Sequence, residues 1–285
     1  MSNEQKRLAI LKEAKKVDWA SDFKLVEKYL KPYIQIDIPF KPQGIKIGQS
    51  KFGGRPDLPE NTDWPKYNDE PMVFLGQFNI FDFKQYDVED ILPKTGVIYY
   101  FAYFKKPESK WGAEYEFIVE KDKYKVLYFD KEDLKPMDYP AGLPEVYKFK
   151  EQELVFDLMY SLPVRESLEI EKFDKEDEDN LWNFNEQFGS GEGEQILGYC
   201  SPIQADVTWD WTFSDLEFDT YELSESDLAK IDSVRPEFIN LLQFTLDNEV
   251  TGFKNIGISI GYFGIKKIDL QNKRFDNAIL IFQDT

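Results

Sequence analysis

Two apolar segments of this chain align without a gap, and each precedes a glycine and a second segment rich in aromatic residues. Residues 73–80 read VFLGQFNI and residues 239–246 read INLLQFTL, with glutamine at the fifth position of each. The segments that follow are GVIYYFAY from Gly96 and GISIGYFG from Gly257. β-branched and aromatic residues at this density are typical of strands. The pattern predicts an α+β fold with mostly antiparallel sheets, built from two related, duplicated β-rich halves.

We expect these halves to belong to one domain that spans residues 1–285. The halves lie at about 33–135 and 196–285, and an acidic connecting region lies at about 150–195. Apolar stripes at helical spacing predict N-terminal helices before the first strand.

Local patterns predict several further elements. Isoleucines alternate with polar residues from Tyr33, which predicts a half-buried strand, and residues 44–48 (GIKIG) are its expected partner. A hairpin is expected from two β-prone runs at 115–120 and 124–130.

Two aromatic segments lie in the acidic half of the sequence. Residues 173–189 predict an acidic helix, with Trp182 among its inward-facing positions. Residues 206–218 (DVTWDWTFSDLEF) alternate apolar and polar residues at their start, which is the period of a strand.

A loop dense in glycine and proline precedes the segment at 73–80. It reads SKFGGRPDLP from Ser50, and a Trp-Pro pair follows it. Such residues favour turning and extended backbone, so we expect residues 49–72 to be an ordered loop without a regular ladder. The Gly-Gly pair lets the backbone pass close either to a strand of the protein or to a ligand. The candidate ligand-binding residues here are Lys51, on an exposed loop, with Gly53, Gly54 and Trp64.

This loop and the strand after it resemble the signature of the YwqG-like proteins, a bacterial family of unknown function. The shared pattern is Ser-Lys-aromatic-Gly-Gly, a Pro-x-Leu-Pro turn, a Trp-Pro pair and a strand with Leu-x-Gln, all within residues 50–77. Residues 196–207, 241–247 and 274–283 resemble later family elements in the same order.

The resemblance covers the chain from about residue 30 to the end and implies an α+β fold built on a duplicated β unit. It implies no reaction. Two departures are visible: Cys200 stands where a proline is expected, and residues 247–262 lack an expected Trp-Gly pair. The element at 196–207 adds Tyr199 and Gln204 to the candidate ligand-binding residues.

The chain has no histidine and a single cysteine, Cys200, and these counts exclude several chemistries. Catalytic triads that use histidine cannot form, and neither a metal site nor a cofactor is expected. No phosphate-binding loop of the GxxxxGK[ST] type is present. The 54 acidic residues leave carboxylate chemistry open. One cysteine, with no signal peptide and no long apolar run, predicts a soluble cytoplasmic protein.

The formal net charge is −19, which argues against binding to nucleic acid or to a membrane surface. The charge is uneven, because residues 151–235 hold 23 acidic and 5 basic residues. Such a region is either a solvated surface or a face for a basic partner.

The two aligned glutamines, Gln77 and Gln243, complete the candidate ligand-binding residues. If their strands are buried, each amide needs hydrogen-bond partners. Either each amide ties the preceding loop to the sheet, or both face a shared pocket for a small polar ligand.

We expect a non-catalytic binding or protein-interaction protein, for which an immunity-type role with a basic partner is one version. The alternative is a carboxylate-dependent hydrolase that acts on sugars or, with Mg²⁺, on phosphoesters. Whether the protein is an enzyme stays open, and binding is favoured.

Overall fold

The computed structural model describes residues 2–104, 121–130, 133–189, 193–246, 249–253 and 259–284, and has the predicted α+β architecture. Its α-helices are α1 (Asn3–Ala14), α2 (Phe23–Tyr29), α3 (Ile80–Phe83), α4 (Glu178–Phe188), α5 (Val207–Asp215), α6 (Glu225–Val234) and α7 (Lys267–Gln271). Short 3-10 helices are η1 (Lys84–Tyr86), η2 (Glu145–Tyr147), η3 (Leu168–Lys172), η4 (Lys175–Asp177), η5 (Arg235–Glu237) and η6 (Phe275–Asn277).

Two antiparallel sheets form the centre of the molecule. The six-stranded sheet has the order β11-β1-β12-β13-β14-β15, with β1 (Lys31–Asp37), β11 (Val155–Ser161), β12 (Gln195–Ile196), β13 (Phe238–Thr245), β14 (Ser259–Lys266) and β15 (Ile279–Asp284). The five-stranded sheet has the order β10-β2-β6-β7-β8, with β2 (Lys51–Phe52), β6 (Val73–Asn79), β7 (Val97–Ala102), β8 (Tyr124–Phe129) and β10 (Gln152–Glu153). The small pairs β3 (Asp57–Pro59) with β9 (Leu134–Pro136), and β4 (Lys66–Tyr67) with β5 (Glu70–Pro71), lie beyond the second sheet.

The two sheets pack together through aromatic side chains and share one hydrophobic core. The ring centroids of Tyr100 in β7 and Phe263 in β14 lie 4.7 Å apart. Phe253 contacts Phe52 of one sheet and Phe244 of the other, at 5.7 and 6.2 Å. Most of the aromatic residues therefore serve packing, because each buried ring removes a large apolar surface from water.

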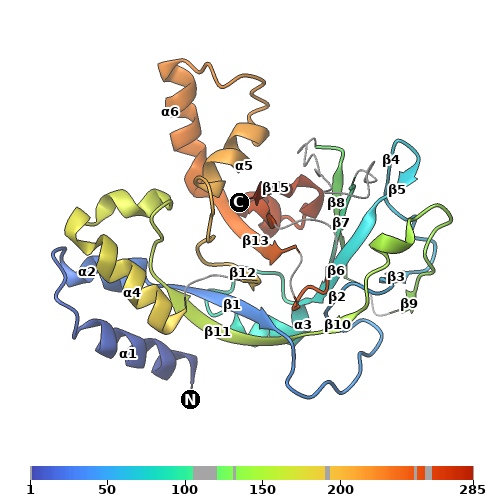
Figure 1. Cartoon of the computed structure of the whole chain (residues 1–285), viewed down its shortest axis with the longest axis horizontal. Helices are drawn as coiled ribbons and strands as arrows, with labels where there is room; N and C mark the ends of the chain where they lie inside the picture. The colour runs from blue at the N-terminus through green and yellow to red at the C-terminus, as the bar shows by residue number, and fades with distance from the viewer. Residues whose placement is uncertain are drawn as a thin grey trace.

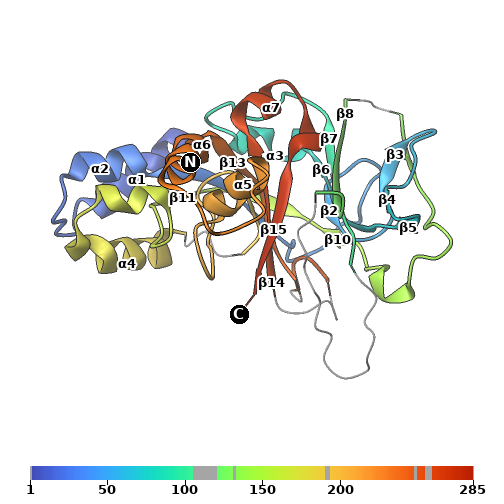
Figure 2. The ribbon, with the colours of Figure 1, turned by 90° about the horizontal axis from the view of Figure 1, so that it is seen from above.

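A second hydrophobic cluster joins α1, α2 and α4 to β11. Figures 1 and 2 show these helices together at one end of the molecule. Leu11 of α1, Val26 of α2 and Phe184 of α4 are buried there with Leu158 and Tyr160 of β11. The opposite end is formed by β6–β8 and the small strand pairs, and the α5–α6 arm projects from the middle (Figure 1).

Several local expectations are wrong. Residues 44–48 form no strand, and β1 pairs instead with β11 and β12. Residues 207–215 form helix α5, because Asp206 caps its first turn and Trp211 packs on Gly264, where no Cβ would fit. Trp182 is 63% exposed, on the outer face of α4.

Other expectations hold or fall outside the described residues. Strand β8 is present, whereas residues 115–120 of the expected hairpin lie outside the described part of the chain. The loop at 49–72 is ordered, but it contains the short strands β2, β3, β4 and β5.

Candidate functional site

The glutamine of β6, Gln77, is fully buried and holds the loop that follows β2. Its Oε1 accepts from the backbone N–H of Asp57 (2.7 Å), and its Nε2 donates to the Gln49 carbonyl (2.8 Å) and the Asp57 carboxylate (2.8 Å). The Tyr99 hydroxyl donates to the Asp57 carbonyl at 2.5 Å. Burial and the nearby Asp57 carboxylate raise the pKa of Tyr99, so it stays a neutral donor. The amide therefore ties the loop to the sheet.

Lys51 lies beside the same carboxylate and is only 4% exposed, so the expected exposed position is wrong. Its Nζ lies 3.2 Å from Asp57 Oδ2, which also accepts from the backbone N–H of Gly48 at 3.0 Å. The lysine is inside because β2 is flanked by both β6 and β10. Lys51 Nζ also lies 3.6 Å from the half-exposed Glu151 carboxylate, whereas Asp57 has no second cation among the described residues. Loss of the lysine would therefore leave the Asp57 carboxylate buried and unpaired, which is costly.

The glutamine of β13, Gln243, makes the corresponding bonds to the loop that follows β12. Its Oε1 accepts from the backbone N–H of Ser201 (2.9 Å), and its Nε2 donates to the Gly193 carbonyl (2.7 Å). The Tyr262 hydroxyl donates to the Ser201 carbonyl at 2.8 Å. Both glutamines thus bond to protein backbone, as the first of the two interpretations requires, and each does so within its own sheet.

The strands around Gln77 and Gln243 pair in the same register. Gln243 lies opposite Gln195 of β12 and Tyr262 of β14, as Gln77 lies opposite the lysine of β2 and the tyrosine of β7. Both central strands also have an irregularity just before the glutamine. We call β2, the turn at 53–57, β6 and β7 the first unit, and β12, the turn at 197–201, β13 and β14 the second unit.

Each turn opens with two residues of positive φ. Gly53 and Gly54 have φ of 60° and 70°, and Leu197 and Gly198 have 66° and 70°. A Cβ on Gly54 would lie 2.6 Å from a side-chain atom of the chain leading into β10, and one on Gly198 would lie 2.5 Å from Tyr33 of β1. The glycines are thus needed where each turn passes a neighbouring part of the protein.

The remaining predicted residues lie elsewhere. Trp64 is buried, donates to the Met72 carbonyl (2.8 Å) and contacts Phe101 (5.5 Å between centroids). It also borders a cavity of about 500 Å³ that includes Tyr67, Tyr124 and several lysines. Gln204 is at the surface and donates to the Asp284 carbonyl at 2.7 Å, away from both glutamines of the two units.

Tyr199 lies in the turn of the second unit and borders a cavity of about 130 Å³, which we call the small cavity. Its hydroxyl donates to the Tyr29 carbonyl at 3.0 Å, and Lys31 Nζ lies 4.1 Å from the centre of its ring. Cys200 also borders the small cavity, and burial raises the pKa of its thiol, which disfavours the reactive thiolate.

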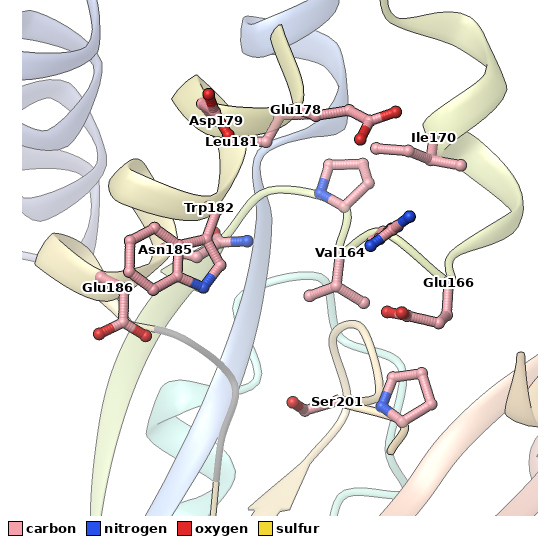
Figure 3. A pocket seen from close by; sticks show the side chains of 13 residues that line it. Val164, Glu166, Ile170, Glu178, Asp179, Leu181, Trp182, Asn185, Glu186 and Ser201 are labelled. Atoms are coloured by element: carbon pink, nitrogen blue, oxygen red, sulfur yellow. The ribbon is translucent and has the colours of Figure 1, made fainter. Parts of the chain in front are cut away.

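A larger cavity of about 370 Å³, which we call the acidic pocket, lies between α4, the segment after β11 and the turn of the second unit. Figure 3 shows Trp182 and Glu186 of α4 on one side, Val164 and Glu166 on the other, and Ser201 at one end. The lining residues fall within the acidic region at 151–235 and include the carboxylates of Glu166, Glu178, Asp179 and Glu186, together with one cation, Arg165. Among the described residues, none of these four carboxylates forms an ion pair.

The wall that carries Trp182 is fixed by two buried polar side chains. Asp177, at the start of α4, accepts from the backbone N–H groups of Ala20 (2.9 Å) and Ser21 (2.8 Å). Burial alone would raise the pKa of Asp177, but these hydrogen bonds hold it below its ordinary value. Asn185 accepts from the Leu162 N–H at 2.8 Å and donates to the Leu162 carbonyl at 3.0 Å. These bonds tie α4 to the segment before α2 and to the residue that follows β11, and they set the position of its exposed face beside the pocket.

The described residues contain no group of three or more metal-ligating side chains. The carboxyl groups whose pKa is raised by burial, Glu194 and Asp210, border none of the three cavities described above. None of the described helices is long and apolar enough to cross a bilayer.

Sequence reasoning missed the residues that define the acidic pocket. Trp182 was expected to face inward, and no local pattern distinguishes Glu166 from the other acidic residues. Asp57 had a usable signal: it stands six residues after Lys51, as Ser201 stands six residues after Gln195.

Comparison with known proteins identifies a family but no activity. A domain of unknown function, DUF1963, matches residues 50–283, which include both units and the acidic pocket. A search of the curated proteins finds no significant match. Because this match covers most of the sequence, the chain belongs to the DUF1963 family of unknown function.

Proposed function

We propose that the protein is a non-catalytic binding protein that takes a basic segment of a partner protein at the acidic pocket. One observation carries the proposal: Trp182, 63% exposed, and four carboxylates without a cationic partner among the described residues border one cavity. This cavity lies in the region, 151–235, that carries almost all of the net negative charge of the chain.

The chemistry of the pocket suits arginine or lysine. A guanidinium or ammonium group is attracted to the face of an indole ring, and carboxylates can accept its hydrogen bonds. Leu181 and Val164 offer apolar contacts for the aliphatic part of such a side chain. An exposed tryptophan beside a pocket is also the residue type that most often dominates binding energy at protein interfaces.

Hydrolysis is the weaker candidate. A general acid needs a carboxyl group that stays protonated near neutral pH within reach of the substrate. Glu194 and Asp210, the carboxyl groups whose pKa is raised, are absent from the lining of the acidic pocket and the small cavity. We therefore favour binding.

The proposal is tested with a fluorescein-labelled oligo-arginine peptide as the probe and fluorescence anisotropy as the readout. Binding is expected at low salt and should weaken strongly as the salt concentration rises. Trp182→Ala should weaken binding by about tenfold or more with little loss of stability, because the ring is mostly exposed.

A matched pair of double variants separates a site from general charge. Glu178→Gln with Glu186→Gln changes the lining of the pocket, and Glu222→Gln with Glu225→Gln makes the same charge change near α6. The first pair should weaken binding several-fold more than the second. Equal effects of the two pairs, together with an unchanged affinity of Trp182→Ala, would contradict the proposal.

We also propose that the two units are copies of one β-rich sequence, within one domain over 1–285 and with halves at about 33–135 and 196–285. The corresponding bonds of Gln77 and Gln243 support this proposal. The sequence motifs predict that the protein belongs to the YwqG-like group and is bacterial. The single cysteine predicts a cytoplasmic location.

A further inference from the structure

The cavity of about 500 Å³ beside Trp64, which we call the lysine cavity, lies between residues 63–72 and strand β8. The linings of the acidic pocket and the small cavity hold more carboxylates than cations. The lysine cavity has the opposite balance, because its lining contains three lysines and two aspartates: Lys66, Lys121 and Lys125, with Asp63 and Asp122. In a chain with a formal net charge of −19, such a lining is an exceptional place that favours an anion.

Two of the three lysines are available to a ligand. Lys66 and Lys125 are exposed, and neither forms an ion pair with any residue in the described part of the chain. Lys121 Nζ lies 3.5 Å from a carboxylate oxygen of Glu217, but both side chains are 76% exposed, so this pair is weak. An incoming anion therefore has no strongly held carboxylate to displace from Lys66 or Lys125.

Strand pairing places Lys125 on the side of the sheet that carries the aromatic wall of the cavity. Lys125 lies opposite Phe101 in the pairing of β8 with β7, so the two side chains project from the same face. The Phe101 ring contacts Trp64, with 5.5 Å between centroids. Tyr103, two residues later, projects from that face as well, and its ring lies 4.9 Å from that of Tyr67. Lys125 thus projects toward the same side as Trp64 and Tyr67.

The second unit shows that the sheet does not need a lysine at this position. Counted from the tyrosine of each unit that bonds to the turn, the pair of Lys125 and Phe101 corresponds to Ile279 of β15 and Gly264 of β14. Ile279 is 6% exposed and packs in one cluster with residues of α5, which covers this face in the second unit. The lysine cavity lies on the corresponding face of the first unit. A covered apolar position in one unit therefore corresponds to an exposed cation beside a cavity in the other.

We propose that the lysine cavity binds a small aromatic phosphate monoester, with the phosphate group at Lys66 and Lys125 and the ring against Trp64, Tyr67 and Leu127. A phosphate monoester carries a charge of about −1.5 to −2 at neutral pH, which matches two lysines without carboxylate partners. Lysine binds phosphate as a point charge, and aromatic and aliphatic walls hold the apolar part of a ligand. The site is independent of the acidic pocket, and the charge of its ligand is opposite.

The experiment is an NMR titration of ¹⁵N-labelled protein with phenyl phosphate at neutral pH and constant ionic strength. The indole N–H of Trp64 and the backbone amides of Tyr67 and Lys125 should shift together and saturate, with affinity in about the millimolar range that so small a ligand allows. The indole N–H of Trp182 should not shift. Phenol has the ring without the charge, and inorganic phosphate has the charge without the ring, so each should bind at least about fivefold more weakly.

Variants that each remove one charge separate a site from general electrostatics. Lys66→Gln and Lys125→Gln should each weaken the affinity for phenyl phosphate by about fivefold or more, and should lose little stability because both side chains are exposed. Lys24→Gln makes the same charge change at an exposed position of α2, at the other end of the molecule, and should leave the affinity unchanged. Trp182→Ala should also leave it unchanged, whatever its effect on binding of a basic peptide.

Three results would overturn the proposal. The first is the absence of a saturable shift at Trp64 in the wild-type protein. The second is an affinity for phenol or for inorganic phosphate equal to that for phenyl phosphate. The third is an equal loss of affinity in Lys125→Gln and Lys24→Gln.

Discussion

In both units, a glutamine and a tyrosine form hydrogen bonds to the backbone of the turn. The side chains at the neighbouring positions differ between the units. In the first unit, Lys51 and Asp57 form a buried ion pair, and the Gln77 amide is bonded on both sides. In the second unit, Gln195 and Ser201 occupy the corresponding positions. Among the described residues, the Oε1 atom of Gln195 and the Oδ1 atom of Asn240 have no hydrogen-bond partner there.

The comparison of the two units separates residues that stabilise the fold from surfaces that are open to a binding partner. The glutamine, the tyrosine beside it and the glycine of the turn appear in both units with the same bonds, so they serve the scaffold. The turn of the first unit is covered by the chain at 149–151. The turn of the second unit borders the acidic pocket through Ser201 and the small cavity through Tyr199.

Replacing Lys51 and Asp57 with the residues of the second unit should have the largest effect on the free energy of unfolding. Lys51→Gln introduces the residue of the second unit but leaves the Asp57 carboxylate buried without its cation, which should cost about 3–5 kcal/mol of the free energy of unfolding. Adding Asp57→Ser removes that charge and should recover most of the loss. Urea unfolding of the two single variants and the double variant measures the coupling. Additive losses in the double variant would show that the lysine and the carboxylate are not a functional pair.

Removing each glutamine amide compares the units directly. Gln77→Met and Gln243→Met keep the length of the side chain and leave buried backbone groups without partners, so each should cost about 2–4 kcal/mol of stability. The Gln77 variant should be the less stable one, because it also removes a donor to Asp57. Thermal or urea unfolding measures both losses. A loss in only one variant would break the proposed equivalence.

A smaller effect is expected at the position just before Gln195. Glu194 accepts from the Thr245 N–H at 3.1 Å, as Ser50 accepts from the Asn79 N–H at 2.9 Å in the first unit. Burial raises the pKa of Glu194 above its ordinary value of 4.5. The folded state therefore favours the protonated form, and this contribution to stability is full below about pH 4.5 and is lost as the pH rises through the higher folded pKa.

Glu194→Gln should consequently stabilise the protein at neutral pH by on the order of 1 kcal/mol and have no advantage at low pH. Unfolding by urea at several pH values measures the difference. Glu186→Gln, at an exposed position of α4, serves as the control for the loss of one negative charge. If the stability advantage of Glu194→Gln over the wild-type protein grew as the pH fell, the pKa of Glu194 would not be raised in the folded state.

Much of the sheet structure was predictable, because β6, β7 and β13 are strongly β-prone and contain the aligned glutamines. Helix α5 was not, because five alternating residues resemble a strand and the contact that decides, Trp211 on Gly264, joins residues far apart in the sequence. The buried position of Lys51 depends on β10 beside β2 and has no local signal.

The candidate site was predictable only as a charged region. The uneven distribution of acidic residues indicated the part of the chain between 151 and 235, and the acidic pocket lies there. The position of Trp182 depends on how α4 packs against α1 and β11, which the helical period did not resolve. Lys125 stands out only when β8 is compared with β15 in three dimensions.

The most direct test of the account is a ¹⁵N NMR titration of the protein with the oligo-arginine peptide at low salt, which reports on both units at once. We expect the largest shifts at the Trp182 indole and in the turn at 197–201, with the turn at 53–57 and the Trp64 indole unaffected. Shifts centred on the turn at 53–57 or on Trp64, or no saturable shift at all, would contradict the claim that the second unit and α4 form the binding face.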